Sequence, residues 1–152
     1  MTHKARSAWQ KLRESDGAVL VESAIGLGIL ILFILGIIEF GFLWYQKQVV
    51  TNASREGARY GVTYQTTSAG SRLAPKNFNP SIQTVVGNYL SGRIPSGSYH
   101  ITVVDNSGYE TGTKGADLIV QVSCQNQMDL LSGFMPQLAS MSFSAQTIMK
   151  CE

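Results

Sequence analysis

The sequence has few of the residue types that build metal centres and active sites. Its only histidines and cysteines are His3, His100, Cys124 and Cys151, spread over 152 residues. Their spacing fits no zinc site, no glycine-rich loop follows a predicted strand, and no Ser, His and Asp are arranged for nucleophilic catalysis. We therefore expect no metal, no cofactor and no catalytic site, so that the protein is not an enzyme.

Charge is also scarce. Charged residues make up 14% of the chain and the net charge is +2, which is too small to favour a nucleic acid as partner. Residues 23–38 carry no charge, and the wider window 18–45 holds only Glu22 and Glu39. About 20 mostly apolar residues are enough to cross a bilayer as a helix. The sequence therefore predicts a transmembrane segment at about residues 18–43.

Basic residues flank this segment unevenly. Four precede it, whereas residues 40–54 contain only Lys47; the four are Lys4, Arg6, Lys11 and Arg13. Because basic residues stay on the cytoplasmic side, we expect residues 1–17 to be a cytoplasmic leader and the chain beyond about residue 45 to lie outside. The apolar run is too long for a secretory signal core and no Ala-x-Ala site follows it, so a retained membrane helix is favoured over a conventional cleaved signal.

Proline is absent before Pro75, so residues 18–62 can form one uninterrupted helix. The aromatic residues 42, 44 and 45, followed by Lys47, are typical of the outer membrane interface. Beyond this point small side chains recur every four residues, at Ala53, Gly57 and Gly61. Such a stripe allows close approach of another backbone. It packs either on this chain's own sheet or on a neighbouring subunit. Within the membrane segment, the same spacing at Ala24 and Gly28 suits contact with another helix.

Residues 63–152 are expected to form a small extracytoplasmic α/β domain. Residues 63–80 are predicted to be a loop, and apolar residues at helical spacing then predict a helix over residues 80–90, with Asn79 as its N-cap. Alternating apolar residues predict three strands: one that begins at residue 98, one over residues 117–125 and one over about residues 141–151. Turn-rich residues 106–115 and a loop at 127–136 separate them.

The predicted fold class is therefore α+β: a long N-terminal helix packed on one short helix and a three-stranded antiparallel sheet. If the second and third strands are antiparallel neighbours, Cys124 and Cys151 lie at opposite ends of the sheet. A disulfide needs Cα atoms within about 7 Å. A Cys124–Cys151 bridge, which an exported compartment would permit, is therefore disfavoured. The alternative is two small buried side chains.

The order of basic leader, Gly17, Glu22 and apolar helix is the arrangement that prepilin peptidases read. We expect cleavage between Gly17 and Ala18, which leaves an ammonium group on Ala18. A carboxylate in hydrocarbon costs at least about 2.5 kcal/mol. Pairing of Glu22 with the Ala18 ammonium of a neighbouring subunit would remove this cost and set the axial register. The simpler alternative is a protonated or interfacial glutamate in a plain anchor.

Three stretches, GAVLVE at residues 17–22, GIIEFG at 36–41 and NASREGARY at 52–60, resemble the TadE-like family. Its members are minor pseudopilins of the tight-adherence (Tad) or type IVc pilus apparatus. The motifs lie within about residues 17–62, and Ser23 departs from the aromatic that the family more often has there. The length of 152 residues resembles TadE rather than the long TadG type.

The resemblance implies processing after Gly17 by a dedicated prepilin peptidase and a role in building or capping a surface pilus used in adhesion. It implies as partners other pilins and minor pseudopilins of the Tad system and an inner-membrane assembly platform. It places the chain in the bacterial inner membrane as a single-pass protein, or in the pilus itself. Two other functions fit the sequence: a membrane-anchored binding module, and a type II secretion-like pseudopilin. The latter typically begins with Phe after the cleaved Gly, where this chain has Ala18.

Overall fold

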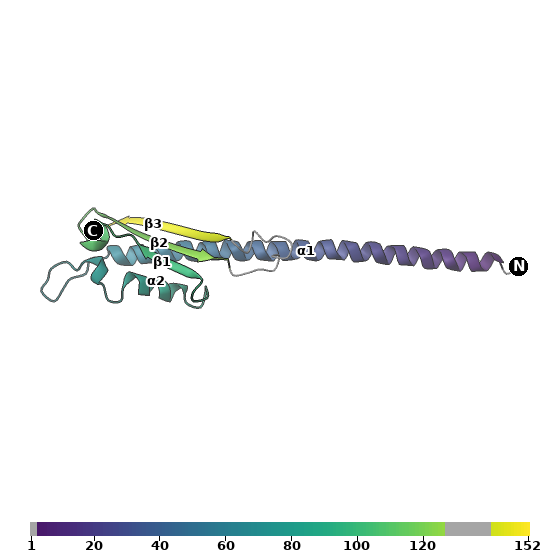
Figure 1. Cartoon of the computed structure of the whole chain (residues 1–152), viewed down its shortest axis with the longest axis horizontal. Helices are drawn as coiled ribbons and strands as arrows, with labels where there is room; N and C mark the ends of the chain where they lie inside the picture. Colours follow the sequence, from purple (N-terminus) through teal and green to yellow (C-terminus); the bar gives the residue numbers. More distant parts are fainter. Residues whose placement is uncertain (1–2, 127–140) are drawn as a thin grey trace. The chain divides into compact units, whose positions relative to one another are not determined.

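The computed structural model describes the backbone of residues 3–126 and 141–152, and side chains within those ranges from residue 17 onward (Figure 1). The chain divides into two compact units, the first ending at Glu39 and the second beginning at Phe40. The predicted α+β fold is confirmed: a long N-terminal helix is followed by a small domain with a short helix and a three-stranded antiparallel sheet. The predicted loop at residues 127–136 lies outside the described residues.

The first helix, α1, spans His3–Val62, so the helix predicted over residues 18–62 is confirmed and begins earlier. Residues 3–16 contain no proline and are rich in Lys, Arg, Gln, Glu, Leu and Ala, which favour helix. The lone Gly17 weakens a helix by only about 1 kcal/mol relative to alanine, too little to end it here. The helix therefore runs without interruption from the predicted leader into the apolar segment.

In the first unit, every side chain from Gly17 to Ile34 is exposed, although most of them are apolar. Leu20 and Phe33, for example, are 71% and 70% exposed. The described helix from Gly17 onward contains a window with a mean hydropathy of 2.6, so it is long and apolar enough to cross a membrane. Hydrocarbon exposed on this scale needs lipid or other protein to cover it.

The second unit contains the sheet, whose strand order is β1-β2-β3, with both neighbouring pairs antiparallel. The strands span Tyr99–Val103, Asp117–Gln125 and Ser142–Lys150. The predicted bounds of β2 are confirmed, and buried and less buried side chains alternate along its whole length. Asp117 lies opposite Lys150 and Cys124 opposite Phe143, so the predicted antiparallel pairing of the last two strands is confirmed.

The short helix α2 spans Ile82–Leu90, and the prediction of Asn79 as its N-cap was wrong. Ser81 caps the helix, because its extended backbone lets its hydroxyl accept a hydrogen bond of 3.2 Å from the Thr84 N–H. The segment predicted as turn-rich contains a further short helix, α3, at Ser107–Glu110. Asn106 caps α3 by accepting a bond of 3.1 Å from the Tyr109 N–H. A 3-10 turn, η1, at Pro75–Asn77 interrupts the predicted loop before α2.

The hydrophobic core of the second unit lies between α1, α2 and the inner face of the sheet (Figure 1). From α1 it takes Val49, Val50, Ala53 and Ala58; Ala53 lies three and four residues after the two valines, on the same face of the helix. Its fully buried members from the three layers include Val50, Ala53, Ala58, Ile82, Val86, Leu90, Leu118, Val120 and Val122. The outer half of α1 is thus a core element of the domain, whereas residues 17–34 are covered by nothing described.

Candidate functional site

The predicted processing site, Gly17 and Ala18, lies on an exposed part of α1. A Cβ atom added at Gly17 would meet nothing within 4 Å. The peptide bond between the two residues is helical, whereas proteases generally bind substrates in extended form. Cleavage there stays a prediction, and it requires this part of the helix to open.

Glu22 lies one turn after Ala18, so the two residues share a face of α1. Its surroundings are exposed hydrocarbon, since Val21 is 59% and Ile25 60% exposed. Within the part of the chain that the structure describes, Glu22 forms no hydrogen bond or ion pair. The site is therefore an acidic side chain on an apolar helical surface. Ala18, four positions before Glu22, is the small residue that would carry a new amine after the predicted cleavage.

The small residues of the membrane segment, Ala24 and Gly28, are exposed. A Cβ atom at Gly28 would meet nothing within 4 Å. Their predicted role in contact with another helix therefore stays a prediction, since the described residues of this chain do not cover them.

The outer small residues pack against the chain's own domain. Ala53 is 0% exposed. A Cβ atom on Gly57 would collide with Val86 of α2 and come within 3.2 Å of Val120 of β2. A Cβ on Gly61 would collide with Leu118 and lie 2.7 Å from Ile82. Of the two alternatives that the sequence leaves open, the structure places the outer stripe on this chain's own sheet and α2.

Three buried polar residues on the described part of α1 were not identified as such from the sequence: Glu39, Gln46 and Ser54, of which Ser54 is 0% exposed. Glu39 and Gln46 are each 1% exposed. Together with Ala53 they recur every seven residues along α1, a spacing that keeps side chains on about the same side of a helix. This seven-residue spacing was the available signal. It was missed because Glu39 lies near the predicted membrane interface, where a carboxylate needs little explanation.

An ion pair on the helix surface joins Arg59 and Glu56, with an N–O distance of 2.9 Å. The hydrogen bond from the guanidinium to the Glu56 carboxylate raises the pKa of Arg59. The Arg59 side chain is 74% exposed, and pairs of this kind contribute little to stability. The pair stabilises a solvated face and forms no chemical site.

The two cysteines are free and buried. Cys124 lies opposite Phe143, near one end of the sheet, and Cys151 follows Lys150 at the other end. Burial raises the pKa of both thiols, which keeps them protonated at neutral pH. Such thiols are poor nucleophiles.

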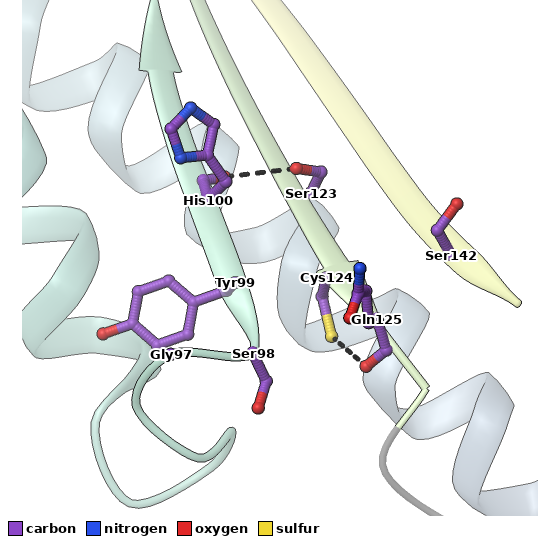
Figure 2. A pocket seen from close by; sticks show the side chains of 8 residues that line it. All are labelled: Gly97, Ser98, Tyr99, His100, Ser123, Cys124, Gln125 and Ser142. Atoms are coloured by element: carbon purple, nitrogen blue, oxygen red, sulfur yellow. Dashed lines mark hydrogen bonds between the residues drawn. The ribbon is translucent and has the colours of Figure 1, made fainter. Parts of the chain in front are cut away.

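A hollow of about 390 Å³ lies at the end of the sheet near Cys124 (Figure 2). Its polar lining includes the backbone at His100, whose carbonyl oxygen accepts a bond of 3.5 Å from the Ser123 hydroxyl. Figure 2 shows the His100 ring directed away from the Cys124 sulfur. Among the residues that the structure describes, no three His, Cys, Asp or Glu side chains are grouped so that they could hold a metal. The described hollow therefore brings no catalytic set together.

Residues 17–59 match the family model described as TadE-like protein. The matched segment contains Gly17, Glu22, Glu39 and Gly57, and ends just before Tyr60. No curated protein and no solved structure matches the chain.

Proposed function

Because residues 17–59 match the TadE-like family model, we propose that this chain is a minor pseudopilin that takes part in the assembly or initiation of a Tad (type IVc) pilus for surface adhesion. The observation that carries the proposal is the exposure of the entire apolar helix surface from Gly17 to Ile34. That surface can anchor the chain in a membrane and can pack against the helices of other subunits.

Glu22 supplies the specificity of this packing. A plain anchor gains nothing from an acid among exposed apolar side chains, because an uncompensated charge opposes insertion into hydrocarbon. After cleavage at Gly17, the Ala18 ammonium of a neighbouring subunit pairs with the Glu22 carboxylate. The attraction between the two charges falls as their separation grows, whereas the cost of removing both from water stays the same. The pair therefore fixes the axial position of each subunit.

The processing enzyme in this account is a prepilin peptidase, and the leader of residues 1–17 faces the cytoplasm. The partners are other pilins and minor pseudopilins of the Tad system and an inner-membrane assembly platform. The domain formed by residues 63–152 lies outside the inner membrane. The match to the TadE-like model supports the Tad system over a type II secretion pseudopilin.

The experiment that tests this function compares Glu22→Ala with Glu56→Ala in cells that express the whole pilus system. Glu56 is a matched control, because it is an acid on the same helix whose only described ion pair is with exposed Arg59. We expect Glu22→Ala to abolish co-purification of other pilins with the membrane-extracted protein. Glu56→Ala should leave that co-purification unchanged. Normal co-purification and normal piliation with Glu22→Ala would refute the proposed role of the acid.

A second candidate function is a membrane-anchored binding module, favoured by the polar hollow at the sheet end. In that case the N-terminal helix is only an anchor. Two outcomes separate these functions. A binding module with a plain anchor would not need Glu22, and it would not co-purify with pilins.

A further inference from the structure

The second unit contains another hollow, of about 460 Å³, between α1 and the loop that joins α2 to β1. The α1 helix contributes Phe42, and the loop contributes backbone and side chains around Arg93 and Pro95. The complete lining is Phe42, Ser91, Gly92, Arg93, Ile94, Pro95, Ser96 and Tyr99. The hollow therefore has an apolar wall, to which Phe42 belongs, and a positively charged side chain, that of Arg93.

Phe42 lies among the aromatic side chains at the outer end of the apolar segment. Phe40 and Trp44 are 67% and 59% exposed, and their rings stack with centroids 6.4 Å apart. Exposed aromatic residues of this kind gather at the level of the lipid headgroups. From Ala18 to Phe42 a helix rises about 36 Å, slightly more than the ~30 Å of hydrocarbon in a bilayer. Phe42, which lines the hollow, therefore belongs to a stretch of α1 with the composition of a membrane interface.

Arg93 is exposed and held in place by its neighbours. Its guanidinium lies 4.5 Å from the centroid of the Tyr89 ring and donates a hydrogen bond to the Tyr89 carbonyl oxygen. Among the described residues no carboxylate pairs with Arg93, whereas Arg59, Lys76 and Lys150 each pair with an acid. A guanidinium has five N–H donors. The donors that Tyr89 does not use are available to an anion.

We propose that this hollow binds the headgroup of a phospholipid in the outer leaflet, with Arg93 on its phosphate and Phe42 against its glycerol and first acyl carbons. Two observations select this occupant. The cation has no acid of its own, and arginine matches the charge and geometry of phosphate. The apolar wall continues from Phe42 to the exposed Tyr45, whose ring centroid lies 6.4 Å from that of Phe42. A bound lipid then holds the α2–β1 loop against the membrane surface.

The inference rests on the membrane insertion in the proposed function, and it is independent of pilus assembly. The test uses the purified full chain in neutral detergent and measures binding of fluorescent phosphatidylglycerol. A diacylglycerol with the same label and acyl chains serves as the phosphate-free probe. We expect a preference for phosphatidylglycerol. Arg93→Gln should weaken its binding about fivefold, the effect of one basic residue at a lipid surface, and Arg93→Lys should restore most of it.

Arg55→Gln is the matched control, since Arg55 is exposed on α1 and does not line the hollow. It should leave lipid binding unchanged. Equal binding of the two probes, or equal loss with Arg55→Gln and Arg93→Gln, would overturn the proposal. Complete displacement of the lipid by millimolar inorganic phosphate would also overturn it, since it would show a site for free anions. Loss of pilin co-purification with intact lipid binding would instead contradict only the proposed function.

Discussion

Thr147 of β3 and Ser54 of α1 share a hydrogen bond, with their hydroxyl oxygens 2.6 Å apart. Ser54 donates its own proton to the Thr51 carbonyl oxygen at 3.1 Å. A hydroxyl carries one proton, so Thr147 must be the donor and Ser54 the acceptor. Ser54 is 0% exposed. This bond joins the last strand to the long helix that the first part of the chain forms.

A double-mutant cycle at these two residues tests that bond. Ser54→Ala leaves the Thr147 donor unpaired and should lower the free energy of unfolding by about 1 kcal/mol. The double variant Ser54→Ala/Thr147→Val should be no less stable than Ser54→Ala alone, because it removes the unpaired group and valine suits a strand. The measurement is denaturant unfolding of the full chain in detergent. Simple additivity of the two single effects would show that the residues do not interact.

Helix propensity alone predicts that Gly57→Ala stabilises the protein. The close packing around Gly57 predicts the opposite. Gly57→Ala should destabilise the second unit, because overpacking against Val86 and Val120 costs about 1–3 kcal/mol. The gain in helix propensity offsets only about 1 kcal/mol of this.

Gly87→Ala is the matched control for Gly57→Ala. Gly87 lies in α2, and a Cβ there would meet only the Tyr99 hydroxyl, at 3.9 Å. This variant should raise the free energy of unfolding by up to about 1 kcal/mol. Thermal unfolding of both variants measures the difference. If the isolated Gly57→Ala protein were also stabilised, the stripe would face away from the domain, as a subunit contact would require.

Burial of Cys124 and Cys151 predicts a loss of stability at alkaline pH. Both folded-state pKa values are raised by burial. The neutral thiols therefore contribute stability that is fully present below the unfolded-state pKa, about 8.5. That contribution is lost as the pH rises through the folded-state pKa. Unfolding measured at about pH 8 and pH 10 should show a smaller drop for the Cys124→Ala/Cys151→Ala variant than for the natural chain.

Thiol titration provides the control for this account of the cysteines. The denatured protein should present both thiols to a thiol reagent, and the native protein should react slowly. A denatured protein with no reactive thiol would contradict the sheet topology, in which the two cysteines lie at opposite ends.

Local sequence patterns predicted those elements that are specified by a regular period or by a continuous run of one residue type. The bounds of β2 follow from strict alternation in DLIVQVSCQ, and the long α1 follows from an apolar run without proline. The cap of α2 was misplaced because Asn79-Pro80 and Ser81 offer competing N-terminal signals two residues apart. Only the extended backbone of Ser81 decides between them. The helix α3 was missed because four residues carry no periodicity.

The candidate site was predictable to the extent that it depends on one helix. Gly17, Glu22 and Gly28 keep in the structure the exposed positions that a lipid- or subunit-facing role needs. The burial of Gln46 was missed, because its only signal in the sequence is the seven-residue spacing from Ala53. The environment of Gly57 likewise depends on α2 and β2, which are distant along the chain.

The intact mass of the protein extracted from membranes of its own host shows whether the N-terminal helix carries a free amine on Ala18, one turn before Glu22. If this helix is the assembly element of a pilin-like subunit, the mass lacks residues 1–17 and the mature chain begins at Ala18. A mature chain that keeps residues 1–17 would contradict it, because the amine that pairs with Glu22 would not exist.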